Sequence, residues 1–228
     1  CSVHGPVTSK EETQQKYKSK NKRGKYKFAA MLEHLDENVG RLMDYLDEAK
    51  LSDNTLVIFY SDNGGKATSQ FPLRGRKGQN YEGGIRVPFI ARYPKMIKAG
   101  TESDQPIISM DLFPSFLEFT GTELMPEQHQ DGMSILPIFR GEKLKRDALY
   151  FHYPHYCLQH DGYPTGVIRR GDYKLIQYFE DDRIELYNLK EDVGEEKNLA
   201  QTNPELAKEM FQQLLKWQKE TGAKIPVK

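Results

Sequence analysis

The sequence contains little cysteine, no excess of charge of either sign and no long apolar run. Only two cysteines occur among 228 residues, Cys1 and Cys157, too few for a disulfide scaffold or for a zinc site built from several thiolates. Lysine plus arginine equals aspartate plus glutamate at 33 each, which argues against nucleic acid or an anionic membrane as a partner. No apolar stretch approaches the ~20 residues of a membrane span. The hydrophobic share of 37% is enough for one large core or two modest ones, as in an enzyme-like domain.

The first residues predict that sequence belongs upstream of them. The chain opens with Cys-Ser-Val-His-Gly-Pro, without an initiating methionine and without the basic and apolar regions of a signal peptide. This opening is typical of the end of a strand and the loop after it. An N-terminus left by processing is the alternative.

Two helices are predicted in the first fifty residues. Residues 10–24 are very polar, with Glu11 and Glu12 in front, which predicts a short surface helix with acidic groups at its positive end. A nucleic-acid patch is the weaker alternative there. Residues 26–50 carry apolar side chains at three- and four-residue steps, from Leu32 to Ala49, which predicts an amphipathic helix packed on a sheet. His34 and Asp36 on this helix are expected to be surface or structural residues.

The middle of the chain predicts strands that lead into polar segments. Residues 55–60 are β-branched, apolar and aromatic, which indicates a buried parallel strand. A long loop over residues 66–86 separates it from a second strand over residues 87–93. Residues 109–120 predict a helix, with Asp111 near its positive end and Pro114 in its first turn.

The pattern changes at about residue 145. Short strands are predicted over residues 149–153, 166–169, 173–179 and 184–189, separated by turns, as in an antiparallel sheet. Pro204 opens a last helix, with Asn203 as its expected cap and a buried stripe of Leu206, Met210, Leu214 and Trp217. We therefore expect two domains, residues 1–145 and residues 146–228.

Asp62 and Asn63 form the strongest cluster of chemically capable residues. They follow directly after the strand over residues 55–60, and open α/β sheets place their sites at such strand ends. A carboxylate and an amide carbonyl are hard oxygen donors that suit Ca²⁺ or Mg²⁺. Because Asp-Asn-Gly-Gly is also ordinary turn chemistry, an Asx turn that closes the strand is the alternative interpretation.

A second candidate is the glycine-rich basic loop over residues 73–88, which contains Arg74, Arg76 and Lys77. Cations on such a loop can bind a tetrahedral oxyanion. It is not a phosphate-binding P-loop, because the required Gly-Lys-Ser/Thr is absent. A solvated basic loop is the alternative.

Histidines supply the remaining candidates. His4 follows the opening strand end. His152 and His155, with Tyr153 between them, could face a substrate or bind a metal, or could pack a loop with their aromatic neighbours.

Together, these motifs resemble the C-terminal half of a type I sulfatase, a formylglycine-dependent enzyme of the alkaline-phosphatase-like superfamily. The resemblance covers essentially the whole chain, and the loop from Arg74 to Pro88 is its most specific part. The matching segments, in order, are residues 3–6, 33–40, 61–65, 74–78, 81–88, 168–176 and 185–189.

The resemblance implies a fold and a site. The fold class is α/β: part of an alkaline-phosphatase-like mixed sheet flanked by helices, plus a small C-terminal antiparallel sheet with a helix. Asp62 and Asn63 become two ligands of Ca²⁺, with Mg²⁺ as the other candidate. Lys77 becomes the contact to the sulfate and the bridging ester oxygen, and His4 a sulfate contact and the acid for the leaving alcohol.

The family nucleophile is a formylglycine made from the first residue of a Cys/Ser-x-Pro-x-Arg motif, and this chain has no such motif. By resemblance, the nucleophile and a further pair of metal-binding aspartates are expected upstream of Cys1. The isolated chain is therefore predicted to be inactive and to need its N-terminal half as a partner. We also expect it to aggregate when alone, because half a sheet exposes strand edges and apolar surface.

The resemblance also indicates a substrate and a location. It implies a hydrolase of sulfuric esters that acts on a sulfated glycan, other sulfated carbohydrate or aryl sulfate, in a periplasmic or secreted protein. The alternatives are a phosphoesterase or phosphonate hydrolase of the same superfamily and a non-catalytic anion- or glycan-binding pseudoenzyme. Asn63 argues against the phosphoesterase, because two-zinc relatives usually carry a histidine after that aspartate. His152, Tyr153 and His155 are predicted to lie on a substrate-facing loop.

Overall fold

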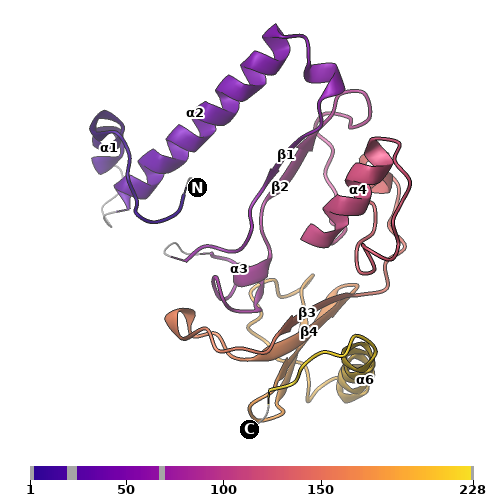
Figure 1. The fold of residues 1–228 in the computed structure, drawn as a ribbon. Helices are drawn as coiled ribbons and strands as arrows, with labels where there is room; N and C mark the ends of the chain where they lie inside the picture. The colour runs from indigo at the N-terminus through magenta and orange to yellow at the C-terminus, as the bar shows by residue number, and fades with distance from the viewer. Residues whose placement is uncertain (1–2, 20–24, 67–69, 227–228) are drawn as a thin grey trace. The chain divides into compact units, whose positions relative to one another are not determined.

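A computed structural model describes residues 3–19, 25–66 and 70–226 (Figure 1). The chain divides into two compact units. One comprises Cys1–Val57 with Arg92–Gly100, and the other comprises Ile58–Ala91 with Thr101–Lys228. These units do not follow the boundary expected at residue 145, which stays a prediction. Within the described ranges, no helix has the length and apolar character to cross a membrane.

The first unit contains the two predicted N-terminal helices, α1 (Glu11–Lys18) and α2 (Tyr26–Glu48). They are joined by an ion pair of 2.7 Å between Lys16 Nζ and Glu33 Oε1. The backbone N–H of Lys10 donates to Nε2 of His34, a contact that fits the surface or structural role expected of that histidine. Part of the apolar stripe of α2 is exposed to solvent, including Leu42 at 51%. Residues 20–24 of the first predicted helix lie outside the described residues.

The strand predicted over residues 55–60 forms as β1 (Val57–Tyr60) and pairs with β2 (Phe89–Arg92). The N–H of Ser61, after β1, donates to the carbonyl of Pro88, just before β2. The end of β1 therefore meets the start of β2, as in antiparallel strands. The prediction of a buried parallel strand is wrong for the described residues. β1 has a single strand partner among them, and Phe59 is 37% exposed.

Among the described residues, one short helix lies between β1 and β2 and three follow β2, and a buried ion pair joins segments of this region. They are α3 (Glu82–Ile85), η2 (Ser109–Asp111), α4 (Leu112–Phe119) and α5 (Leu136–Phe139). Pro114 lies in the first turn of α4, as predicted. Asp111 is fully buried and pairs with Arg146, with Nη2 2.5 Å from Oδ1 and Nη1 2.9 Å from Oδ2. It also accepts the N–H groups of Ile108 and Met133, so it joins three segments rather than only capping a helix.

The C-terminal sheet is antiparallel, as predicted, with the order β3-β4-β5-β6. Its strands are β3 (Leu149–Tyr153), β4 (Thr165–Arg170), β5 (Tyr173–Tyr178) and β6 (Ile184–Asn188), and a 3₁₀ turn, η3 (Leu158–His160), follows β3. The register places Val167 opposite Ile176, and Ile176 opposite Glu185. Short turns between the strands make this meander a product of local sequence.

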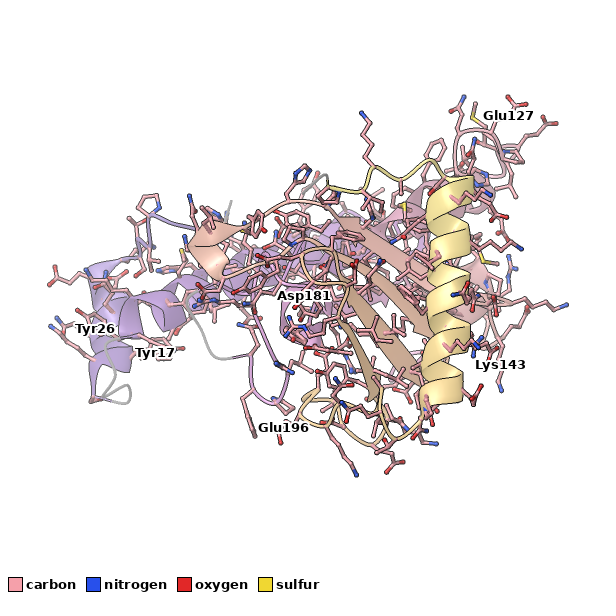
Figure 2. The ribbon with its side chains drawn as sticks, turned by 90° about the horizontal axis from the view of Figure 1, so that it is seen from below. Tyr17, Tyr26, Glu127, Lys143, Asp181 and Glu196 are labelled. Carbon is pink, nitrogen blue, oxygen red and sulfur yellow. The ribbon has the colours of Figure 1, made fainter. Side chains whose placement is uncertain are left out.

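One face of this sheet is covered by α6 (Pro204–Glu220), shown beside the strands in Figure 2. Its residues Met210 and Leu214 are fully buried, and the Trp217 ring stacks on Tyr150 with centroids 4.8 Å apart. The other residues of this apolar layer are Ile168, Leu175, Leu186 and Ala207. The predicted stripe is thus confirmed, but the side chain of Asn203 makes no capping bond, contrary to expectation.

The opposite face of the same sheet is more polar. Val167, Ile176 and Leu189 form part of its core, together with Tyr178 and Tyr187. Lys174 lies opposite Tyr187 in the register, and Glu185 lies opposite Ile176, so both belong to this face. Both are buried, with exposures of 0% and 8%. Since burial of charge is costly without partners, the segment that covers this face must supply them.

Candidate functional site

The Asp62-Asn63 pair lies just after the end of β1, as the sequence predicts. The hydroxyl of Ser61 donates to the carbonyl oxygen of Asn63 at 3.1 Å, which fixes the turn. The Asp62 side chain is exposed and Asn63 is half-buried. Among the described residues, neither the Asp62 carboxylate nor the Asn63 side-chain amide takes part in a hydrogen bond, so their side-chain oxygens are available to a ligand.

Gly64 brings this strand end against α3. Its N–H donates to the carbonyl of Gly84 at 2.9 Å. A Cβ atom at position 64 would lie 1.9 Å from the carbonyl oxygen of Gly83, so only glycine fits. The glycines after Asn63 therefore allow two backbones to approach, beyond forming a turn.

Lys77 also lies close to the end of β1. The N–H of Lys77 donates to the carbonyl of Gly65 at 3.2 Å. Lys77 lies between Gly75 and Gly78, whose φ angles of 79° and 84° belong to the left-handed region that favours glycine. Its side chain is half-buried, and no described acidic group pairs with it. A cation and two oxygen donors thus come from segments joined by backbone hydrogen bonds.

Residues 160–165, in the C-terminal part of the chain, form hydrogen bonds with the loop that carries Lys77. Gln79 Nε2 donates to the carbonyl oxygens of His160 at 2.9 Å and Asp161 at 3.1 Å. Arg76 forms an ion pair with the side chain of Asp161. Asn80 Nδ2 donates to the Thr165 hydroxyl at 2.8 Å. Loop residues on both sides of Lys77 are therefore fixed by the turn that leads into β4.

Three tyrosines cluster around Glu185, where the segment that follows the Lys77 loop meets the C-terminal sheet. The hydroxyls of Tyr81, Tyr178 and Tyr187 donate to Glu185 Oε2 at 2.8, 3.2 and 2.9 Å. The Arg74 guanidinium lies 4.0 Å from the Tyr81 ring centroid. Burial, together with the Glu185 charge, raises the pKa of Tyr178 to about 12. Burial raises the pKa of Tyr81 and Tyr187 as well, so all three remain neutral hydrogen-bond donors at neutral pH.

Beneath α3 lies a cluster of buried charges formed by Glu82, Lys174 and Glu195, which are at most 1% exposed. Lys174 Nζ lies 3.0 Å from Glu82 Oε1 and 2.8 Å from Glu195 Oε1. Glu195 Oε2 accepts the backbone N–H of Glu82 at 2.6 Å. Burial raises the pKa of Glu195 above its ordinary value, and Lys174 opposes that rise. Arg86 approaches Glu82 Oε2 at 3.9 Å from the solvent side.

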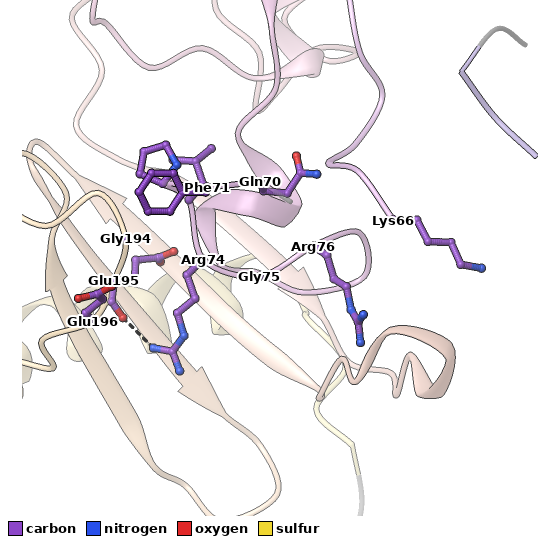
Figure 3. Close-up of a pocket in the computed structure, with 11 residues that line it drawn as sticks. Lys66, Gln70, Phe71, Arg74, Gly75, Arg76, Gly194, Glu195 and Glu196 are labelled. Carbon is purple, nitrogen blue, oxygen red and sulfur yellow. Dashed lines mark hydrogen bonds between the residues drawn. The ribbon is translucent and has the colours of Figure 1, made fainter. Parts of the chain in front are cut away.

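An open hollow of about 850 Å³ adjoins this region (Figure 3). Figure 3 shows Arg74 directed toward the Glu195 backbone, whose carbonyl oxygen accepts from Arg74 Nη1 at 2.7 Å. Arg76 and Lys66 line the hollow, and Phe71 lies at its rim with 87% of its surface exposed. The lining of the hollow thus includes three cationic residues, one aromatic ring and two glutamates, Glu195 and Glu196.

The donors at the strand end fit a hard divalent cation in kind. The Asp62 carboxylate and the Asn63 amide offer oxygens without competing protein partners among the described residues, as Ca²⁺ or Mg²⁺ requires. Those residues contain no group of three or more His, Cys, Asp or Glu arranged to hold a metal. The pair would therefore supply two ligands of a site whose other ligands are water or residues outside this set.

The predicted histidines lie in different surroundings. His4 is exposed and belongs to the first unit, whereas Asp62 and Lys77 belong to the second. His152 Nε2 lies 3.0 Å from the carbonyl of Lys224, and the His152 ring packs edge-on against Phe179. These contacts favour the packing interpretation of His152, and its contact with substrate stays a prediction.

The other two members of this predicted loop differ in exposure. His155 is exposed, and its ring packs against the half-buried Tyr153 with centroids 5.7 Å apart. The contacts of both residues with substrate also stay predictions.

Sequence reasoning missed Lys174, Glu185 and Glu195. Lys174 and Glu185 carried a readable signal, because each interrupts an apolar strand at a position that the alternation directs into the core. Glu195 carried none, since it lies in an irregular loop.

The fold and the site define a class: an α/β protein with a basic, glycine-rich loop beside oxygen donors suited to a metal. Two family models match the chain. "Sulfatase" covers residues 2–122, and "N-sulphoglucosamine sulphohydrolase, C-terminal" covers residues 76–220. A sulfatase of Formosa agariphila is 37% identical over 94% of this chain and 44% of its own length. The chain belongs to the sulfatase family.

Further relatives agree with this assignment. An N-acetylglucosamine-6-O-sulfatase of Bacteroides thetaiotaomicron is 38% identical over 72% of this chain and 30% of its own length. The crystal structure of Ps i-CgsB in complex with k-i-k-neocarrahexaose matches with a TM-score of 0.83 and 30% identity, over 94% of this chain and 47% of that one. A phosphonate monoester hydrolase of Agrobacterium radiobacter, at 22% identity and a TM-score of 0.65 over 86% of this chain and 41% of that one, shares the fold. The chain spans less than half the length of these relatives.

Proposed function

We propose that this chain forms part of the active site of a sulfuric ester hydrolase. Asp62 and Asn63 hold a divalent cation in this proposal, and Lys77 binds the sulfate group. The observation that carries it is the pair of backbone hydrogen bonds from Gly64 to Gly84 and from Lys77 to Gly65. These bonds join the oxygen donors and the cation in one compact unit. Membership in the sulfatase family supports the reaction type.

The chemistry follows from charge. When a sulfate ester is cleaved, negative charge grows on the leaving oxygen and on the sulfuryl oxygens. A Lys77 ammonium group held in place by its loop stabilises that charge without reorganising. A Ca²⁺ or Mg²⁺ ion bound at Asp62 and Asn63 would act as a Lewis acid toward the sulfate oxygens. His4 is proposed to protonate the leaving alcohol.

The proposed substrate is a sulfated carbohydrate, with an aryl sulfate as the simplest analogue. The name of the Bacteroides relative, an N-acetylglucosamine-6-O-sulfatase, supports this class. Lys66, Arg74 and Arg76 around the hollow suit a polyanionic glycan. His152, Tyr153 and His155 are proposed to face the substrate, as the sequence predicts. The formylglycine nucleophile, the need for an N-terminal half and a periplasmic or secreted location are proposed from the family.

The test is steady-state hydrolysis by the whole protein of which this chain is part, with 4-nitrophenyl sulfate and N-acetylglucosamine 6-sulfate as substrates. We expect release of sulfate that EDTA reduces and calcium restores, and no turnover by residues 1–228 alone. Lys77→Ala should lower kcat/KM by about 10²–10³, the cost of removing one group that stabilises the transition-state charge. The control, Lys216→Ala, changes a surface lysine of α6 that is 74% exposed and should leave kcat/KM unchanged.

Two results would count against the proposal. Faster hydrolysis of 4-nitrophenyl phosphate than of the sulfate would favour a phosphoesterase. Sulfate binding without turnover by the whole protein would favour the pseudoenzyme.

A further inference from the structure

The charged side chains buried against one face of the C-terminal sheet have no charged counterpart on the face covered by α6. The side chains buried there are apolar apart from the hydrogen-bonded pair Gln177 and Gln218. An ion cluster contributes little stability by comparison with well-packed apolar residues, because taking charges out of water is costly. The Glu82, Lys174 and Glu195 side chains are nevertheless almost completely buried. Their contacts therefore suggest a role in fixing geometry rather than in stabilising the sheet.

The first contact of this cluster is with α3. Glu82 is the first residue of α3, and its side chain meets Lys174 while its backbone N–H donates to Glu195. Lys174 and Glu195, which we call the anchor of α3, thus bind both the side chain and the backbone of Glu82. The anchor spans a long sequence distance, since Lys174 is 92 positions from Glu82.

The second contact runs from α3 to both halves of the proposed site. Gly83 donates its N–H to the carbonyl of Arg74 at 2.6 Å, at the start of the Lys77 loop. Gly84 accepts from Gly64 at 2.9 Å, next to Asn63. The two residues directly after Glu82 are therefore bonded to the two segments that carry the cation and the oxygen donors.

We infer that Lys174 and Glu195 are positioning residues, which hold Glu82 and through α3 set the placement of Lys77 relative to Asp62 and Asn63. This inference rests on the proposed function for the identity of the site, but the anchoring itself can be tested without turnover. Through Lys174 on β5, the C-terminal sheet thereby fixes the position of the loop that carries Lys77.

Glu195→Gln is the variant that tests the anchor. A glutamine can accept the Glu82 N–H or face Lys174 with its oxygen, but not both. Either the charge-assisted bond from the Glu82 N–H or the ion pair with Lys174 is therefore lost. We expect amide hydrogen exchange of Gly64, Lys77 and Gly83 to become about 10- to 100-fold faster, as the loss of a hydrogen bond to a charged group implies. Exchange in β3 and β4 should stay unchanged. The matched control is Glu191→Gln, an exposed glutamate of the same loop.

Turnover gives the second readout. In the whole protein, with rates normalised to formylglycine content, Glu195→Gln should lower kcat/KM by about tenfold or more, while Glu191→Gln leaves it unchanged. A merely structural role would lower the yield of folded enzyme but not this normalised value. If the wild type shows no sulfatase turnover, the proposed function fails, and the exchange experiment still decides the anchoring.

Amide hydrogen exchange of the wild-type protein tests the inference even if Glu195→Gln does not fold. The amides of Gly64, Lys77 and Gly83 should show protection within about tenfold of the amides in β5 and β6, because one opening event exposes both. Exchange of these loop amides more than 100-fold faster than in β5 and β6 would overturn the inference. Unchanged exchange in a folded Glu195→Gln variant would do the same.

Discussion

Two backbone segments of the site approach closely at Gly64, where a methyl group would overlap the carbonyl of Gly83. Gly64→Ala should therefore lower the unfolding free energy of its unit by about 1–3 kcal/mol, the usual cost of overpacking. It should also weaken sulfate binding, because Asn63 and α3 are forced apart. Urea unfolding followed by Trp217 fluorescence measures the first effect, and calorimetric titration with sodium sulfate measures the second.

The control for this substitution is Gly40→Ala in the middle of α2. Apart from the neighbouring backbone of α2 itself, no atom lies within 4 Å of the Cβ position there. Alanine should stabilise that helix by about 0.5–1 kcal/mol, because it restricts the unfolded chain more than glycine does. Equal destabilisation by both substitutions would contradict a role for the contact between Gly64 and Gly83.

The buried carboxyl group of Glu195 should make the free energy of unfolding depend on pH. Burial raises the pKa of Glu195 in the folded state, so the folded chain binds this proton more tightly than the unfolded chain. Its contribution to the unfolding free energy is full below the ordinary glutamate pKa of about 4.3 and is lost as the pH rises through the raised pKa. The stability of the wild type relative to Glu195→Gln should therefore fall as the pH rises from about 4.3.

Urea unfolding at a series of pH values measures this difference. The control Glu191→Gln should run parallel to the wild type throughout. A difference between wild type and Glu195→Gln that increases with pH would show that the folded state favours the ionised carboxylate.

At the scale of elements, α6 and the C-terminal sheet form the best-packed layer of the chain. Leu214 is fully buried among Ile168, Leu175 and Leu186. Leu214→Ala should lower the unfolding free energy by about 2–5 kcal/mol, because it removes apolar contacts and leaves a cavity. Chemical unfolding monitored by circular dichroism checks this, with Lys216→Ala on the exposed side of α6 as a control within about 0.5 kcal/mol of wild type.

The two faces of this sheet make different kinds of contact. The α6 face supplies apolar burial, whereas the opposite face presents Lys174, Glu185 and Tyr187 to the segment from Arg74 to Glu82. A loss of less than 1 kcal/mol in Leu214→Ala would mean that the α6 face is not the main source of stability.

At the scale of the whole molecule, balanced charge coincides with exposed apolar side chains. The formal charge is zero at pH 7, and Leu32, Leu42 and Tyr45 on α2 are exposed, as are Phe113 and Phe116 on α4. We expect the isolated chain to associate at neutral pH and to dissociate near pH 10, where net negative charge opposes contact. Dynamic light scattering across this pH range measures it. A sharp monomer peak at pH 7 with cooperative melting would contradict the expectation.

Local sequence patterns predicted much of the fold. The strands β3 to β6 and the helix α6 appear at their predicted positions because short turns and alternating or helical apolar spacing act between near neighbours. The position of Asp62 and Asn63 after a strand also followed from local pattern. The burial of β1 did not, because an apolar run does not specify how many neighbours a strand will have.

The sequence by itself determined the family motifs, the order of elements and the residue types of the candidate site. Only the tertiary structure decided that Glu82, Lys174 and Glu195 meet, and that Glu185 gathers three tyrosines. Arg74 and Glu195, for example, are separated by 121 positions and joined by one hydrogen bond. Periodicity reports which face of an element is buried, but the pairing of two buried polar groups depends on how distant segments pack.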